Sequence, residues 1–365
     1  MDNFTRRILK WFQENGRHDL PWQQDPSPYR VWVSEIMLQQ TQVATVVPYF
    51  KRFIKRFPDI ETLAQSSIDD VLNQWTGLGY YARGRNLHRT AQIICDTYQG
   101  QFPEDIEVLI ALPGIGRSTA GAILSLACKQ RHPILDGNVK RVLTRFHAIE
   151  GWPGSTKVEQ QLWLLADKHT PFEKVDQYTQ AIMDLGATVC TRKATHCESC
   201  PVKSGCTAKR QDRQNDYPTP RQKRSLPVRK TAFVIVENHD GEILLEQRPP
   251  SGIWGGLWGF PECSPKDDIH AWVKKQLGLT ANTIHYKPKL RHTFSHFHLD
   301  IVPVHIQAHN IDNRVNDSAR FCWFTPDTYN VVGLATPVKR ILDEITYVTV
   351  EEGIDEQNGS LRKIG

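Results

Sequence analysis

The sequence predicts a multidomain protein in which an all-α domain is followed by an α+β domain. Its 365 residues exceed what one ordinary hydrophobic core supports. Apolar residues recur at helical spacing up to residue 189. From residue 230 onward, alternating apolar runs bounded by glycine are typical of strands. We therefore expect domains at 1–212 and 230–350, a basic, proline-containing linker at 213–229, and a disordered tail at 351–365.

The composition is that of a globular protein with a mild excess of positive charge. Hydrophobic residues make up 39% of the chain and the formal net charge is +5, which fits a polyanionic partner without requiring one. No run of eighteen apolar residues exists, and the first residues lack the apolar core of a secretory signal. We therefore expect a cytoplasmic protein without a membrane span, whose eight cysteines do not form disulfides.

One carboxylate is expected on the apolar face of a helix that begins near Pro28. Proline suits the first turn of a helix, and Glu35 lies about one turn from both Val31 and Leu38. On that face desolvation raises the pKa of a glutamate, whereas a glutamate at the edge of the face would reach water. The amides of Gln39–Gln42 at the end of the helix suit either hydration or hydrogen bonds to base edges.

A glycine-rich loop, Gly77–Arg85, combines two adjacent tyrosines with two arginines. Such a loop suits a grip on a nucleic-acid backbone, with an aromatic side chain wedged between bases. It is also compatible with an ordinary turn in which one tyrosine packs inside.

Residues 105–128 predict two helices joined by a tight hairpin. Apolar residues recur at helical spacing on both sides of Pro113–Gly116. Gly114 and Gly116 permit backbone conformations that a Cβ forbids, and amides at the start of the second helix attract phosphate. This is the pattern of a helix-hairpin-helix, a sequence-independent clamp on a nucleic-acid backbone, although many such turns only join packed helices.

Asp136 follows Gly116 by twenty residues and precedes another helical pattern that begins near Val139. Aspartate is among the best N-cap residues, and a helix N-terminus favours the ionised carboxylate. An ionised carboxylate can also stabilise positive charge that develops on a sugar. The two interpretations, a helix cap and a functional group, do not exclude each other.

Four cysteines lie within seventeen residues, separated by six, two and five residues: Cys190, Cys197, Cys200 and Cys206. Four thiolates at such spacing suit zinc or an iron–sulfur cluster. Structural zinc usually uses two matched Cys-x-x-Cys pairs, and this segment has only one. Cys95, Cys128, Cys263 and Cys322 have no ligand spacing and are expected to be ordinary thiols.

The second domain resembles a Nudix fold that has lost its metal site. Strands are expected at 232–236 and 243–248, and a helix at 269–276. Gly256 and Glu262 match the Nudix signature, but Lys274 and Lys275 stand where metal-binding glutamates belong. The loop Phe294-Ser295-His296 leads into a strand whose one face carries Phe297, Leu299 and Ile301. The other face carries His296, His298 and Asp300. These three residues suit an exposed polar face better than a metal site.

Together these motifs resemble the A/G-specific adenine DNA glycosylase (MutY) family, within the helix-hairpin-helix superfamily of DNA glycosylases, over nearly the whole chain. Five signals occur in the family's order. They are Glu35 in Ser-Glu-Ile-Met-Leu-Gln-Gln-Thr-Gln, the Leu-Pro-Gly-Ile-Gly hairpin, Asp136 in Leu-Asp-Gly-Asn-Val-Lys-Arg, the four cysteines, and the Nudix-like domain with Phe294-Ser295-His296.

The resemblance implies a base-excision repair enzyme that flips out adenine mispaired with 8-oxoguanine or guanine and hydrolyses its N-glycosidic bond. Glu35 would be the general acid, and Asp136, supported by Asn138, the stabiliser or nucleophile at the sugar. The four cysteines would hold a 4Fe–4S cluster. A cytoplasmic, DNA-associated bacterial monomer that acts on double-stranded DNA is expected.

The resemblance also implies two sets of DNA contacts. The helical domain would use Gln40 and Tyr80 as wedges beside the lesion, with further contacts from Leu78, Gly114, Gly116, Ser118 and Lys140. The second domain would read 8-oxoguanine through Phe294, Ser295 and His296.

Two alternatives remain at this point. The endonuclease III branch shares the hairpin, aspartate and cluster, but its strand-nicking lyases place a lysine where Ser118 stands, so we expect a monofunctional glycosylase. A non-catalytic DNA-binding protein would use the hairpin and the cluster alone, and would not need the Glu35 and Asp136 pair.

Overall fold

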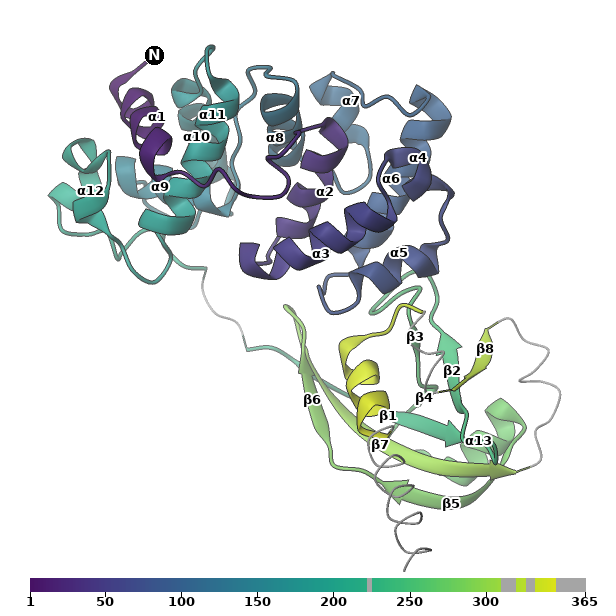
Figure 1. The fold of residues 1–365 in the computed structure, drawn as a ribbon. Helices are drawn as coiled ribbons and strands as arrows, with labels where there is room; N and C mark the ends of the chain where they lie inside the picture. The colour runs from purple at the N-terminus through teal and green to yellow at the C-terminus, as the bar shows by residue number, and fades with distance from the viewer. Residues whose placement is uncertain (222–224, 310–319, 326–331, 346–365) are drawn as a thin grey trace, which may run out of the picture. The chain divides into compact units, whose positions relative to one another are not determined.

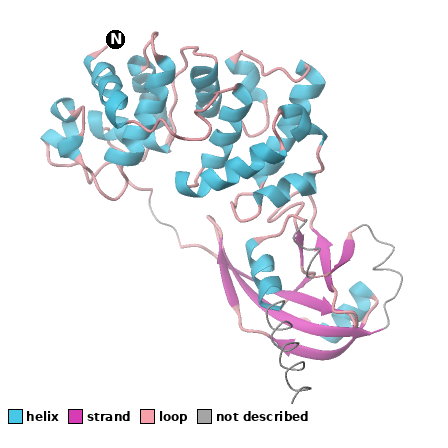
Figure 2. Ribbon diagram, viewed as in Figure 1, coloured by secondary structure: helices cyan, strands magenta, loops and turns pink. Residues whose placement is uncertain are grey.

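The computed structural model of the chain describes residues 1–221, 225–309, 320–325 and 332–345 (Figure 1). Its contacts divide the chain into two compact units, residues 1–65 with 86–223 and residues 66–85 with 224–365. The first unit is helical and the second is built on a mixed sheet (Figure 2). The predicted fold class, an all-α domain followed by an α+β domain, is confirmed. The expected tail at 351–365 lies outside the described residues.

The first unit consists of helices joined by short loops. Its helices are α1 (Asn3–Asn15), α2 (Pro28–Leu38), α3 (Val43–Arg56), α4 (Ile60–Gln65), α7 (Ile106–Ala111), α8 (Arg117–Ala127), α9 (Gly137–His147), α10 (Thr156–His169), α11 (Val175–Asp184) and α12 (Thr207–Arg210). A π-helical turn, Leu185–Val189, continues α11, and α6 (Ala82–Tyr98) enters this unit at residue 86. Within the described part of the chain, no helix is both long and apolar enough to span a membrane.

The helix α2 is largely buried in the first unit, where it packs against α3 and α8. Trp32, Val33 and Met37 are fully buried, and Val31 and Ile36 nearly so. Ser27 caps the helix by accepting a hydrogen bond from the Arg30 amide at 3.3 Å, and Pro28 occupies its first turn. Glu35 is therefore set among buried apolar residues, next to Ser34, whose hydroxyl donates to the Val31 carbonyl at 2.8 Å.

The second unit contains an eight-stranded mixed sheet, whose central path is β3-β2-β1-β7-β5. β1 (Val228–Glu237) runs parallel to β7 (His298–His309), and β5 (Thr280–Tyr286) and β6 (Leu290–Thr293) pair with β7 in the antiparallel sense. The other elements are β2 (Ile243–Gln247), β3 (Trp258–Gly259), β4 (Glu262–Cys263), α13 (Ile269–Leu277), β8 (Phe321–Phe324), α5 (Ile68–Trp75) and a helix over residues 336–345. Phe297, Leu299 and Ile301 are buried, which confirms the predicted alternation.

A close approach in the first unit positions the segment that precedes Asp136. A Cβ added at Gly121 in α8 would lie 2.6 Å from the carbonyl oxygen of Pro133. Backbone packed this tightly cannot shift without moving residues 133–136. The glycine therefore sets how closely α8 approaches this segment.

We predict that Gly121→Ala destabilises the first unit by about 1–3 kcal/mol, the usual cost of overpacking a core. The measurement is denaturant unfolding of the full chain. Gly137→Ala, at the first residue of α9, is the control, because a Cβ there meets nothing within 4 Å. Equal stability of the two variants would contradict the packing argument.

Candidate active site and cysteine loop

Glu35 and Asp136, which are 101 positions apart in the sequence, line one cavity of about 870 Å³ in the first unit. The end of α2, the loop after it, and the first turns of α8 and α9 supply most of the wall. Further lining residues come from the N-terminal loop and from the region that follows α11. The lining includes Arg17, Leu20, Trp22, Leu38, Gln39, Gln40, Ser118, Asn138, Arg141, Gln180, Met183 and Thr191.

The environment of Glu35 favours its protonated form. Burial raises the pKa of Glu35 to about 8, and the charge of Asp136 acts in the same direction. This is the direction predicted from the apolar face of α2. A carboxyl group with such a pKa holds a proton at neutral pH and can donate it inside the cavity.

Asp136 is the N-cap of α9, as its position before Val139 predicted. Its carboxylate accepts hydrogen bonds from the Val139 amide at 2.8 Å and from Asn138 Nδ2 at 2.9 Å. The pKa of Asp136 lies above its ordinary value, because burial outweighs these hydrogen bonds and the charge of Arg141, which lower it. The anion of Asp136 is therefore supported by several donors, which distinguishes its environment from that of Glu35.

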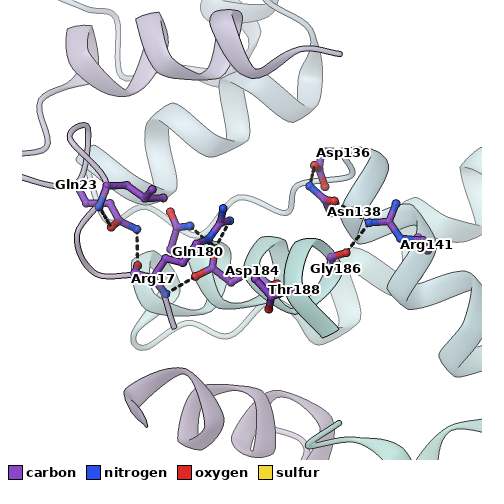
Figure 3. Close-up of polar contacts among 10 residues, drawn as sticks. Arg17, Gln23, Asp136, Asn138, Arg141, Gln180, Asp184, Gly186 and Thr188 are labelled. Carbon is purple, nitrogen blue, oxygen red and sulfur yellow. Dashed lines mark hydrogen bonds and ion pairs between the residues drawn. The ribbon is translucent and has the colours of Figure 1, made fainter. Parts of the chain in front are cut away.

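Arg141 connects this cap to the cysteine loop, a role that the sequence analysis missed. Its guanidinium donates to Asn138 Oδ1 at 2.8 Å and to the Gly186 carbonyl at 2.5 Å (Figure 3). It also donates to the Cys190 carbonyl at 2.7 Å. A Cβ at Gly186 would lie 2.6 Å from the Asn138 Cβ, so the π-helical turn also packs directly on α9. The spacing of Asn138 and Arg141, three residues apart on one helix, was the available signal.

A buried ion pair forms another part of the cavity wall. The Asp184 carboxylate is fully buried and accepts from the Arg17 amide at 2.8 Å, from Arg17 Nε at 2.9 Å and from Gln180 Nε2 at 2.8 Å (Figure 3). Arg17 and Gln180 both line the cavity. The sequence did not predict this group, because Arg17 and Asp184 are 167 positions apart and no local pattern marks the pair.

The hairpin has the geometry expected of a backbone clamp. Gly114 has a φ of +79°, which favours glycine, and Gly116 is exposed at the start of α8. Ser118 lies in the first turn of α8, where its Oγ accepts from the Leu135 amide at 3.0 Å. Ser118 thus positions the chain just before Asp136.

The remaining residues expected to contact DNA in the helical domain differ in accessibility. Gln40 is exposed with a φ of +58° and lines the cavity. Tyr80 is half exposed, with a φ of +49°, whereas Leu78 is buried. Lys140 Nζ lies 2.5 Å from Glu159 Oε1 in an ion pair.

The four cysteines after α11 are free thiols that line one small cavity. Among the described residues, no three His, Cys, Asp or Glu side chains form a group suited to a single metal ion. The buried Arg145 guanidinium lies beside the cavity and donates to Cys190 Sγ at 3.3 Å.

In the second unit, the loop Phe294-Ser295-His296 is a turn with an exposed tip. The Phe294 amide donates to the Phe297 carbonyl at 2.9 Å, and their rings stack at 4.6 Å. Ser295 and His296 are exposed. Asp300 pairs with Arg291, and His298 hydrogen-bonds Thr293, as expected for an exposed polar strand face.

Comparisons with known proteins agree over both units. Residues 33–168 match the family model of the HhH-GPD superfamily of base excision DNA repair proteins, and residues 232–344 match that of the NUDIX domain. An adenine DNA glycosylase of Buchnera aphidicola (subsp. Acyrthosiphon pisum) is 40% identical over 93% of this chain and 97% of its own. The human adenine DNA glycosylase is 33% identical over 93% of this chain and 73% of its own.

Solved structures support the fold of the helical unit. A thermostable thymine-DNA glycosylase matches with a TM-score of 0.53 and 24% identity, covering 57% of this chain and 95% of that one. An endonuclease III trapped as a covalent intermediate on DNA matches with a TM-score of 0.50 and 21% identity, covering 57% of this chain and 95% of that one.

We predict that Arg17→Met destabilises the first unit by about 3–5 kcal/mol, because it leaves the buried Asp184 carboxylate without its cation. The measurement is denaturant unfolding. The control is Arg340→Met, which breaks an ion pair with the exposed Glu344 and should cost about 0–1 kcal/mol. A small loss for Arg17→Met would mean that water compensates Asp184.

Proposed function

The chain belongs to the adenine DNA glycosylase family of base-excision repair enzymes, and we propose that it removes adenine mispaired with 8-oxoguanine or guanine in double-stranded DNA. The observation that carries this proposal is the pairing of Glu35 with Asp136 in one cavity, where burial and neighbouring groups act differently on the two carboxyls. Two carboxyl groups in opposite protonation states are the requirement of glycoside hydrolysis.

In the proposed mechanism, protonated Glu35 donates its proton to the flipped adenine. The glycosidic C–N bond breaks, its electron pair leaves with the base, and positive charge develops on the deoxyribose. The Asp136 carboxylate stabilises this charge or traps it briefly as a covalent adduct, and water then adds to the sugar. Asn138 holds one carboxylate oxygen of Asp136, and Arg141 holds Asn138.

Arg17 and Gln180 are candidates for contacting the flipped base. Both line the cavity, and Asp184 holds both side chains in place. A site with fixed donors can reject bases whose hydrogen-bonding groups do not match.

We expect the hairpin at Gly114 and Gly116 to grip the DNA backbone, with Gln40 and Tyr80 beside the lesion. Exposure supports the roles of Gln40 and Tyr80, because both side chains are open to solvent. Leu78 is buried and would contact DNA only after its loop moves. Lys140 would contact phosphate only by leaving Glu159.

The hydrogen-bonded Ser118 supports monofunctional hydrolysis. A lyase needs an amine nucleophile at the sugar, and position 118 offers a hydroxyl that already accepts from the Leu135 amide. The nearby amine of Lys140 is held in an ion pair with Glu159 on α10. The cytoplasmic location and the monomeric state remain expectations.

The four cysteines fit a 4Fe–4S cluster. They are unpaired and line one cavity together, and their number and spacing suit the ligands of such a cluster. Burial raises the pKa of Cys200 to about 12, so its thiolate needs a positively charged ligand. When bound, the cluster would fix the loop that Arg141 joins to α9.

We predict that Glu35→Gln lowers single-turnover adenine release at least ~10²–10⁴-fold, the usual contribution of general acid catalysis. Binding of an A:8-oxoguanine duplex should stay nearly intact. In the wild type, release should decline above about pH 8, because a carboxyl group whose pKa is raised to about 8 loses its proton there.

Stability provides the control for this variant. Above pH 8 the folded wild type holds an ionised, buried Glu35, whose ordinary pKa is 4.5, so folding is disfavoured there relative to the glutamine variant. Glu35→Gln should therefore unfold at the same or a higher temperature at pH 9. Activity of the variant within a few-fold of wild type would refute the assignment of Glu35.

We propose that the second domain reads 8-oxoguanine opposite the adenine. The adenine is an ordinary base, so another element must inspect the opposite strand. 8-Oxoguanine differs from guanine by a C8 carbonyl and an N7–H donor, which the exposed Ser295 hydroxyl and His296 imidazole can both contact.

We predict that Ser295→Ala combined with His296→Ala reduces the preference for A:8-oxoguanine over A:G, because each lost contact is worth about 1–3 kcal/mol of discrimination. Single-turnover adenine removal on the two duplexes measures it. The rate should fall mainly on the 8-oxoguanine duplex. An unchanged ratio between the duplexes would show that the loop is only a turn.

We predict that the purified protein contains about four iron and four sulfide per chain, the stoichiometry of one 4Fe–4S cluster. Cys200→Ser should lower both, whereas Cys322→Ser, at an exposed thiol away from the loop, should not. Stoichiometric zinc without iron would contradict the cluster.

A further inference from the structure

Residues 66–85 belong to the same compact unit as the sheet, and two hydrogen bonds hold the end of this segment there. The hydroxyl of Tyr81, a buried residue, donates to the Leu334 carbonyl at 2.8 Å. Arg85 Nη1 donates to the Gly255 carbonyl at 2.6 Å. These partners lie in two separate loops of the second unit.

Packing reinforces this attachment. A Cβ added at Gly333 would lie 2.7 Å from the Leu72 Cβ, and one at Gly256 would lie 3.7 Å from Leu72 Cδ1 and 3.8 Å from Arg85 Cδ. Gly256 has a φ of +75°. Leu72 itself is fully buried. The two glycine loops therefore form a close-fitting seat for α5 and for the start of α6.

Tyr80 directly precedes Tyr81, and its backbone has a conformation that neighbouring residues must stabilise. Its φ of +49° is unfavourable for a side chain of this kind. Arg83 lies near the rings of both Trp75 and Tyr80, 5.4 Å and 5.5 Å from their centroids. Arg83 Nη2 and Trp75 Nε1 both donate to the Gly79 carbonyl, at 3.0 Å and 3.1 Å.

The same segment continues along α6 into the first unit. There Thr90 Oγ1 donates to the Pro113 carbonyl at 2.8 Å, and Asn86 lies against Gly114, whose added Cβ would meet the Asn86 Cβ at 2.9 Å. One helix thus joins the Tyr80 loop to the hairpin.

We propose that Tyr81 and Arg85 are positioning residues that couple the second domain to the Tyr80 wedge and so set the discrimination between mispairs. This inference rests on the proposed function. Contact of the second domain with 8-oxoguanine would fix the seat formed by its glycine loops. These loops, packed on α5 and on the start of α6, would then keep Tyr80 in the conformation in which its ring inserts between bases while adenine is flipped. Without the anchors, Tyr80 would leave its unfavourable backbone conformation more often.

The test compares Tyr81→Phe with Tyr29→Phe. Tyr29 is a matched control in the first unit, because its buried hydroxyl also donates to a backbone carbonyl, that of Phe57, at 2.8 Å. Single-turnover adenine removal would be measured at saturating enzyme on A:8-oxoguanine and A:G duplexes. Tyr81→Phe should reduce the ratio of the two rates about fivefold, the effect of losing one buried hydrogen bond. Tyr29→Phe should leave it unchanged.

A double-mutant cycle tests whether Tyr81 and the loop Phe294-Ser295-His296 act together on the ratio of the two rates, or whether Tyr81→Phe only makes the fold less stable. Tyr81→Phe would be combined with Ser295→Ala and His296→Ala. If the Tyr81 hydrogen bond acts through the loop Phe294-Ser295-His296, the combined variant should lose little more discrimination than the variant with Ser295→Ala and His296→Ala alone. Fully additive losses would overturn the coupling. Arg85→Gln serves as the second anchor variant if Tyr81→Phe folds poorly, and it should show the same pattern.

The outcomes also separate this inference from the proposed function. A wild type that shows no preference for the 8-oxoguanine duplex would overturn the proposed function. A wild type with that preference, together with an unchanged ratio in both anchor variants or an equal drop in Tyr29→Phe, would overturn the anchoring role alone.

Discussion

The desolvation of two carboxyl groups in one cavity is the constraint around which the helical unit is arranged. Burial acts on both Glu35 and Asp136 in the same direction, so only their neighbours can separate their protonation states. The start of α9 provides that separation by turning backbone and side-chain donors toward Asp136. The buried apolar residues of α2 offer Glu35 no comparable support.

The hydrogen bonds that begin at Asp136 continue beyond the cavity to the cysteine loop. Asn138 holds Asp136, Arg141 holds Asn138, and Arg141 also binds the carbonyl of Cys190. Anything that orders the cysteine loop therefore also restrains the donors around Asp136. In the proposed mechanism, a cluster bound by the cysteines would therefore restrain Asp136 without itself taking part in hydrolysis.

Local chemistry made much of this predictable from the sequence. Periodicity indicated the helices, aspartate before Val139 indicated the cap of α9, and the apolar neighbours of Glu35 indicated the direction of its pKa shift. The Arg17–Asp184 pair could not be predicted, because its partners are 167 positions apart and nothing local marks them. The grouping of residues 66–85 with the sheet depends on loops at 255–256 and 333–334, and only the folded chain brings these together.

That grouping has a consequence for how the chain can be divided. Cutting at the linker would separate a fragment that has lost the partners of Leu72 and Tyr81, both buried in the complete chain. Such a fragment would expose apolar side chains and tend to aggregate. The two domains are therefore poor candidates for independent expression or for exchange between relatives at the linker. A recombinant of two relatives would keep this packing only if α5 and the two glycine loops came from the same parent.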